Sequence, residues 1–255
     1  MKIYTVSDIH IDFHENHGWL TSLSSVDYQD DILILAGDIA DAIESLKAAF
    51  EILSDTFHGV CYVPGNHDLW LRHGTWHDSM EKFHSILKLA DQYGINTKPV
   101  EFGNVTIIPL FGWYDYSFGE PSVDLRRSWV DYVACRWEKG MNDDDITQYF
   151  LSLNERALEI KNRCVITFSH FVPRIDVMPS FIPKHRRYLY PVLGTNLLEH
   201  QIRRIHPRIH IYGHTHVNRQ VKIDNITYIN NAYGYPHEGA ITRKKLFCVY
   251  SDEMI

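Results

Sequence analysis

The stretch that decides the fold is Ile32-Leu33-Ile34-Leu35-Ala36-Gly37-Asp38. Four consecutive apolar residues that soon meet a glycine are typical of a strand that is buried on both faces. Residues 41–53 follow, and their apolar side chains recur at steps of three and four, as they do on the buried face of a helix. A buried strand followed directly by an amphipathic helix is the repeating unit of an α/β fold.

The same alternation extends along the rest of the chain. Runs rich in β-branched residues predict further strands at 3–6, 60–63, 105–110, 165–168, 209–212, 227–229 and 246–250. Helical spacing predicts helices at 76–93, at 144–162 and from about 195 to 205. Strands without long helices after residue 205 favour antiparallel additions in the last third. We also expect loop-rich insertions near 112–145 and 171–193.

Length and composition narrow the class of protein. A chain of 255 residues allows one large domain or two small ones, and because it has no repeat and no Pro/Gly/Ser linker we expect a single domain over 1–255. A formal net charge of −7 argues against an extended nucleic acid as the partner. No apolar run approaches the roughly 20 residues that span a bilayer, so we expect no membrane partner.

The cysteines and the first residues bear on location. Four cysteines are scattered without a C-x-x-C pair, which predicts reduced thiols rather than a disulfide framework or a cysteine metal site. A strand begins almost at once and no secretory signal pattern precedes it. A cytoplasmic location is the default expectation, and no feature of the sequence indicates an oligomeric state.

Metal-type ligands follow five of the predicted strands. They are Asp8 with His10, Asp38, Asn66 with His67, His170, and His214 with His216. In open α/β sheets, ligands bind outside the carboxyl ends of the strands. The first and last of these sets are pairs two residues apart, so in an extended segment both side chains of a pair would point to one side. Gly37, Gly65 and Gly213 stand directly before ligands, where a missing Cβ allows a sharp turn and a close approach.

Taken singly, each of these residues has an ordinary structural interpretation. Asp38 could cap a helix, and Gly65-Asn66 is a common turn pair. An isolated His170 is more often a core histidine than a ligand. Coincidence poorly explains seven candidate ligands, with His67 left out of the count, at five strand ends, so we favour a metal site.

The motifs D-x-H, G-D, G-N-H-D, a lone histidine after a strand and G-H-x-H occur in this order over residues 8–216. In combination they resemble the calcineurin-like metallophosphoesterase family. The resemblance implies an α/β fold in which a two-sheet β-sandwich is flanked by helices. It also implies two divalent transition-metal ions, bridged by Asp38. One ion would be bound by Asp8, His10, Asp38 and His216, and the other by Asp38, Asn66, His170 and His214.

The resemblance also assigns chemistry. A ligand set of nitrogen and oxygen without thiolate suits Mn, Fe, Zn, Co or Ni, of which we favour Mn. His67 would donate a proton to the leaving oxygen or stabilise charge on the phosphoryl group. We place Asp68 with His67 in the catalytic group, and we expect Asp68 and Asp41 to orient histidines through hydrogen bonds.

These assignments predict a dinuclear-metal-dependent hydrolase of phosphate esters, either a phosphomonoesterase or a phosphodiesterase. Its partner would be a small-molecule phosphate ester or a nucleotide. A basic run at 184–187 lies in the second insertion, and we single out Arg174, Arg186 and Arg187 as candidates to bind a second phosphate. The second and third motifs differ from the G-D-x-V-D-R-G and G-N-H-E of protein phosphatases, which disfavours a dedicated protein phosphatase.

Two alternatives stay open. A nuclease would need a groove or an extra domain that follows a phosphate backbone, which a chain of this length and negative charge does not suggest. A non-catalytic metal-binding scaffold of the same fold should have lost ligands or the acid. Every ligand and His67 are present in the sequence, so the enzyme is the favoured interpretation.

Overall fold

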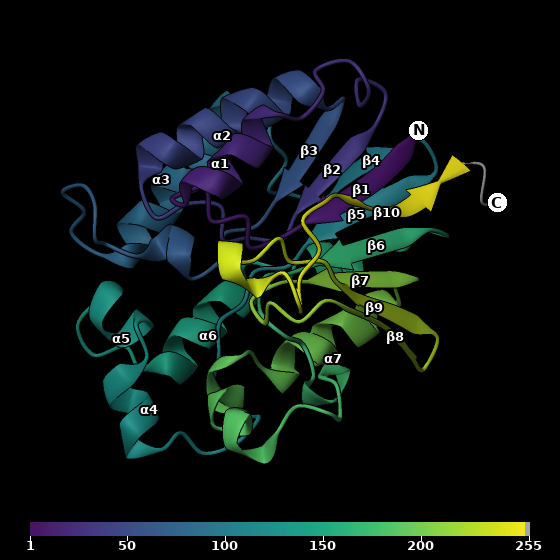
Figure 1. The fold of residues 1–255 in the computed structure, drawn as a ribbon. Helices are drawn as coiled ribbons and strands as arrows, with labels where there is room; N and C mark the ends of the chain where they lie inside the picture. Colours follow the sequence, from purple (N-terminus) through teal and green to yellow (C-terminus); the bar gives the residue numbers. More distant parts are fainter. Residues whose placement is uncertain (253–255) are drawn as a thin grey trace.

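The computed structural model describes residues 1–252, and within them two sheets pack face to face (Figure 1). The first sheet has the strand order β10-β1-β2-β3. Its parallel strands are β1 (Lys2–Val6), β2 (Ile32–Leu35) and β3 (Gly59–Tyr62). Strand β10 (Phe247–Ser251) returns antiparallel to β1 and closes the edge.

The second sheet has the order β4-β5-β6-β7-β9-β8. A parallel centre is formed by β5 (Val105–Pro109), β6 (Val165–Phe168), β7 (Ile209–Tyr212) and β9 (Ile226–Asn230). Both edges are antiparallel, with β4 (Val100–Phe102) on β5 and β8 (Arg219–Ile223) on β9. The antiparallel additions expected in the last third are β8 and β10, whereas β9 pairs with β7 in parallel.

Strand β2 shows why the sequence forms a layered structure. Its side chains alternate between two cores, as the period of two in a strand requires. Ile32 and Ile34 pack between the two sheets, and Leu33 and Leu35 pack against the helices on the outer face of the first sheet. An unbroken apolar run is therefore needed to bury both faces of the strand.

Helices cover the outer face of each sheet (Figure 1). On the first sheet lie α1 (His14–Thr21), α2 (Ile43–Thr56) and α3 (Ser79–Gln92). On the second sheet lie α6 (Asp143–Ser152), the 3-10 turn η2 (Ala157–Glu159) and α7 (Asn196–Ile205). Short polar residues fix several helix starts: Asp78 accepts a hydrogen bond from the backbone N–H of Glu81 and caps α3, and Asn142 forms a capping box with Asp145 before α6.

The two segments expected to be loop-rich contain short helical pieces. The first, 112–145, holds α4 (Val123–Ser128) and α5 (Asp131–Ala134) and runs into α6. The second, 171–193, holds the 3-10 segments η3 (Ile175–Val177) and η4 (Lys184–Val192). Two more 3-10 turns, η1 (His67–Leu69) and η5 (Pro236–Glu238), lie next to predicted site residues. Within residues 1–252, no helix has the length and apolar character needed to cross a bilayer.

The helix predicted over 144–162 is too long, because α6 ends at Ser152. Asn154 is buried just beyond that end, where its side chain accepts from the backbone N–H of Phe111 and donates to the carbonyl of the same residue. These two bonds tie the side chain to the segment that follows β5. The chain turns there and resumes only as η2.

Candidate active site

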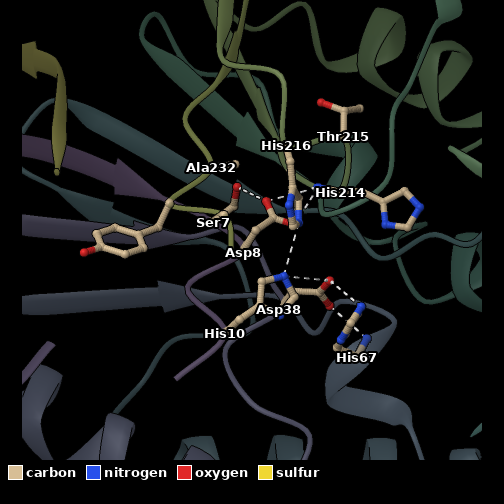
Figure 2. Close-up of polar contacts among 12 residues, drawn as sticks. Ser7, Asp8, His10, Asp38, His67, His214, Thr215, His216 and Ala232 are labelled. Carbon is tan, nitrogen blue, oxygen red and sulfur yellow. Dashed lines mark hydrogen bonds and ion pairs between the residues drawn. The ribbon is translucent and has the colours of Figure 1, made fainter. Parts of the chain in front are cut away.

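The predicted ligands come together at the carboxyl ends of β1, β2, β3, β6 and β7. Within 4.8 Å of one another, ring nitrogens and carboxylate oxygens form the groups Asp8–His10–His216, His10–Asp38–His67 and Asp38–His170–His214. Figure 2 shows Asp8 beside His216, with Asp38 between His10 and His67. The remaining predicted ligand, Asn66, directs its Oδ1 to within 3.1 Å of His170 Nε2.

The backbone reaches this arrangement by left-handed turns. Five predicted ligands have a positive φ, which is uncommon for residues other than glycine. They are Asp8 (52°), His10 (47°), Asp38 (57°), His214 (68°) and His216 (53°). The expectation of extended D-x-H and H-x-H pairs is therefore wrong. Each such backbone conformation costs free energy and persists only where surrounding contacts enforce it, which is typical of functional sites.

Two of the glycines before ligands are required by close contacts. A Cβ on Gly65 would lie 2.1 Å from Asp38 Oδ1, and a Cβ on Gly213 would lie 2.7 Å from the carbonyl oxygen of Ala36. Neither contact is tolerated by a real side chain. These positions bring the loops after β2, β3 and β7 into direct contact behind the ligands.

Asp8, His10 and His216 form one half of the cluster. His216 Nε2 lies 3.2 Å from Asp8 Oδ1 and 3.1 Å from His10 Nε2. On its other side, His216 Nδ1 lies 2.5 Å from Glu238 Oε2 in η5. A carboxylate behind a ligating imidazole fixes the ring orientation and leaves Nε2 for a cation.

His170 and His214 form the other half with Asn66. His170 Nε2 lies 3.1 Å from His214 Nδ1, while backbone carbonyls hold the opposite nitrogens: Ala36 O at 2.8 Å from His170 Nδ1 and Val192 O at 3.1 Å from His214 Nε2. Asp38 Oδ2 stands between the halves, 3.4 Å from His170 Nε2 and 3.9 Å from His10 Nε2.

The electrostatics of the cluster favour added positive charge. Burial, reinforced by the neighbouring imidazoles, lowers the pKa of His10 and His170, and lowers that of His214 to about 3, so these rings are neutral lone-pair donors. Burial and the nearby carboxylates Asp8 and Asp68 raise the pKa of Asp38 well above its usual range. A cation between these groups would relieve that repulsion and use the crowded lone pairs, so the donor set fits divalent transition metals.

His216 behaves differently from the other rings. Burial disfavours its charged form, but Asp8 and Glu238 outweigh burial and raise the pKa of His216 to about 9. The same interactions with His216 hold the pKa of Asp8 below its usual range despite burial.

His67 lies at the edge of this cluster rather than inside it. Its Nε2 is 3.9 Å from Asp38 Oδ2, and its ring stacks on Trp70 with centroids 3.5 Å apart. The side chain of His67 is 16% exposed, against 1% for His10 and for His170. The imidazole is therefore the one in this comparison that an incoming ester reaches most readily.

Asp68 faces away from the site. Its carboxylate is fully buried and accepts from the backbone N–H groups of Asp38, Ile39, Ala40 and Gly65 and from the Tyr62 hydroxyl. These contacts bind the loop after β2 to the loop after β3. Asp68 thus holds the backbone of Asp38 and Gly65 in place, and no histidine is among these partners.

Asp41 also lies apart from the ligating histidines. Its Oδ1 is 3.9 Å from the ammonium group of Lys82, and its Oδ2 is 3.8 Å from His73 Nε2. Lys82 is 1% exposed and donates to the carbonyl oxygens of Asp41, at 2.6 Å, and of Trp70. Asp41 therefore serves as the counter-charge of a buried lysine.

The arginines singled out from the sequence occupy two environments. Arg174 binds Asp176 and Glu199 and lies over the ring of Tyr228, so its guanidinium group is directed to α7 and β9 rather than to the cluster. Arg186 and Arg187 are exposed on η4. That segment ends at Val192, whose carbonyl oxygen contacts His214.

Sequence reasoning missed three residues that contact the cluster. Glu238 contacts His216, and Tyr235 places its hydroxyl 3.3 Å from His67 Nε2. Asp131, in the first insertion, accepts from the side-chain amide of Asn66 at 2.8 Å. None of them belongs to a strand-end motif, so the pattern of ligands after strands gives no signal for them.

Comparisons with known proteins agree with this geometry. A family model described as calcineurin-like phosphoesterase matches residues 1–218. The chain is 26% identical over 263 residues to the acyl-carrier-protein phosphodiesterase PptH of Mycobacterium tuberculosis, covering 92% of this chain and 78% of PptH. It is 24% identical over 264 residues to an uncharacterized protein of Acanthamoeba polyphaga mimivirus, covering 91% of each.

Solved structures confirm the predicted fold. The crystal structure of the phosphopantetheinyl hydrolase PptH from Mycobacterium tuberculosis matches with a TM-score of 0.84 and 24% identity, over 100% of this chain and 97% of that one. A structure from Thermus thermophilus matches with a TM-score of 0.53 and 14% identity, over 96% of each chain. The resemblance read from the motifs is confirmed: the chain belongs to the calcineurin-like phosphoesterase family and is a metal-dependent phosphoesterase.

Proposed function

We propose that this phosphoesterase hydrolyses the phosphodiester that joins a phosphopantetheine group to a carrier protein. One observation carries the proposal: the metal-type cluster occurs in a chain that is similar along nearly its whole length to PptH, which is named an acyl-carrier-protein phosphodiesterase. The motifs led us to expect a small or nucleotide-like ester. Phosphopantetheine is a small group of this kind, presented on a protein.

We propose a centre of two divalent ions, with Mn favoured. Asp8, His10, Asp38 and His216 would hold one ion, and Asp38, Asn66, His170 and His214 the other. The position of Asp38 Oδ2 near both His10 and His170 supports its role as the bridging ligand. Such a pair of ions, when bound, lowers the pKa of a water and neutralises charge on the phosphoryl group.

The residues around the centre would complete the reaction. His67 Nε2 would donate a proton to the leaving oxygen on the carrier, and its exposure supports contact with that group. Stacking on Trp70 would keep the ring in the orientation needed for transfer. Asp68 would contribute indirectly, by fixing the two loops that carry Asp38 and Asn66.

The route to the site supports a protein-borne substrate. Lys184, His185, Arg186 and Arg187 are exposed on η4, together with Tyr188, and the segment leads directly to the contact between Val192 and His214. Against a net charge of −7, this basic surface would attract an acidic carrier or a substrate phosphate. We further propose that 1–255 is a single domain. A cytoplasmic location is a proposal that rests on the scattered cysteines.

The experiment compares metal-stripped and Mn-loaded protein on a phosphopantetheinyl carrier protein, with release of the free carrier followed by mass spectrometry. We expect release only with metal. Bis-p-nitrophenyl phosphate, p-nitrophenyl phosphate and single-stranded DNA serve as comparison substrates. Turnover of the small diester without release from the carrier would contradict the proposed substrate. Faster cleavage of DNA would favour the nuclease, and no turnover of any substrate with metal bound would favour the scaffold.

A further inference from the structure

We propose that Asp131 is a positioning residue that turns the amide oxygen of Asn66 toward the metal centre. Asp131 is the first residue of α5, inside the first insertion, and is 65 positions from Asn66. Its side chain is buried, and its Oδ1 accepts from Asn66 Nδ2 at 2.8 Å. The inference rests on the two-ion centre proposed above and adds a residue that no motif assigns.

The orientation of Asn66 is the central step. An asparagine amide has an oxygen on one side and an NH2 group on the other, and only the oxygen can bind a cation. A carboxylate is acceptor-only, so it accepts the NH2 side and repels the oxygen. With Nδ2 fixed on Asp131, the Oδ1 of Asn66 is directed to His170 Nε2, 3.1 Å away.

The same carboxylate anchors two aromatic rings at the rim of the site. Its Oδ1 also accepts from Trp70 Nε1 at 2.7 Å, and its Oδ2 accepts from Trp129 Nε1 at 2.8 Å. Trp70 stacks on His67, and the Trp129 ring lies edge-on to His214 with centroids 6.0 Å apart. The Tyr114 hydroxyl completes the set at 3.3 Å from Oδ2.

Replacement by leucine would remove every acceptor while keeping a branched side chain of similar shape. The two oxygens of Asp131 accept on opposite sides, from Asn66 and Trp70 on one side and from Trp129 and Tyr114 on the other. An asparagine could keep its one oxygen on the Asn66 side and turn its NH2 group toward the Tyr114 hydroxyl, whereas a leucine offers no acceptor to either side. Because unpaired donors are expensive in a buried site, Asn66 is expected to lose its fixed orientation in the leucine variant.

The test measures metal binding by Asp131→Leu in the full chain. Mn is titrated calorimetrically, and spin coupling between the two ions is followed by electron paramagnetic resonance. We expect one of the two binding steps to weaken by about 10- to 100-fold, the usual effect of losing an outer partner of a ligand, while the other step stays within about twofold. A merely structural weakening would lower both steps together.

The matched control is Asp143→Leu. Asp143 lies in the same insertion, at the start of α6, and accepts from the Tyr116 hydroxyl, away from the ligands. It should bind both ions as the wild type does. If Asp131→Leu does not fold by circular dichroism, Asp131→Ser, which leaves room for a water, is expected to show the same selective loss.

The outcomes separate this inference from the function on which it rests. Wild-type protein that binds fewer than two ions would contradict the two-ion centre itself. Wild type with two ions and folded Asp131 variants with two equally tight ions would overturn the positioning role alone. Equal weakening of both steps would overturn it as well.

Discussion

At the scale of single residues, the site separates two jobs that one residue type performs. His10 and His170 are buried and His214 is half-buried, and the rings of all three are neutral and held by groups around them. His67 instead lies beside the cluster, is partly exposed and stacks on an indole ring. The first arrangement suits the proposed ligands, and the second suits the proposed proton donor.

His67→Ala should therefore slow turnover by roughly 10²–10⁴-fold, the usual contribution of one general acid or base, without loss of metal. Elemental analysis of the purified variant measures the metal, and steady-state kinetics on a small diester measure turnover. His73→Ala is the matched control, because His73 is exposed and contacts Asp41 rather than the cluster. Loss of one ion in His67→Ala would show that this residue is a ligand instead.

Asp38→Ala, in contrast, should lose both ions, because Asp38 is the proposed bridging ligand. Elemental analysis that finds two ions per chain in this variant would contradict the bridging role.

The meeting of the candidate ligands could be predicted from sequence because each follows a short apolar strand. Their supporting residues could not, and Asp131 shows the reason. It lies in no motif, and its contact with Asn66 depends on how a whole insertion packs over the site. Asp41 and Asp68 illustrate the converse: a carboxylate close to a motif in sequence binds a buried lysine in one case and backbone N–H groups in the other.

At the scale of elements, periodicity predicted the buried strands and the amphipathic helices on them, and it missed elements with little burial. The apolar run of β2 and the spacing in α2 reflect burial on known sides, so pattern and structure agree. Strands β4 and β8 lie at sheet edges with few fully buried residues, and their patterns are correspondingly weak. Helix α1 begins at His14 without a side-chain cap, and the sequence gives no signal for its start.

The pairing of β6 with β7 contains a buried histidine that makes stability depend on pH. His210 Nδ1 lies 2.9 Å from Thr167 Oγ1, and its Nε2 lies 3.2 Å from Ser169 Oγ. Ser169 donates to the carbonyl of Phe171, so it can accept from His210 Nε2. Both ring nitrogens are thus satisfied in the neutral form. Burial lowers the pKa of His210 to about 3.

Because the unfolded chain takes up a proton near pH 6.5 and the folded chain does not until about pH 3, this histidine destabilises the fold as pH falls between those values. Between pH 7.5 and pH 5 the free energy of unfolding should fall by about 2 kcal/mol because of this histidine. In metal-free protein, His210→Gln should be less stable than wild type at pH 7.5 and should recover about that difference by pH 5. Urea unfolding at both pH values measures this free energy. If it changes with pH in the same way for both proteins, His210 is not the cause of the pH dependence.

At the scale of the whole molecule, the site exists only because two sheets meet. Asp8, Asp38 and Asn66 follow strands of the first sheet, and His170, His214 and His216 follow strands of the second. Each half of the cluster mixes ligands from both sheets. The motifs could predict that candidate ligands from several strand ends lie close together, because five strand ends carry such residues. The insertions that surround it, including η4, were predictable only as loops.

The surface of η4 (Lys184–Val192) is where the whole molecule would recognise a protein substrate. Attraction between a basic surface and an acidic carrier acts through association, so it should raise the apparent affinity for the carrier and weaken with salt. A small diester has no such surface. Arg186→Glu with Arg187→Glu should therefore lower kcat/KM for the carrier protein at least tenfold more than for bis-p-nitrophenyl phosphate, mainly through KM.

The control for this prediction carries the same change in charge at a distance from the site. Lys47→Glu with Lys88→Glu alters exposed residues of α2 and α3, on the outer face of the first sheet, and should leave turnover of the carrier unchanged. Raising the salt concentration should reduce the difference in kcat/KM for the carrier between the wild type and the Arg186→Glu, Arg187→Glu variant. Screening by salt removes from the wild type the attraction that the variant has already lost. If both double variants slow the carrier reaction equally, net charge alone is responsible, and η4 is not the docking surface.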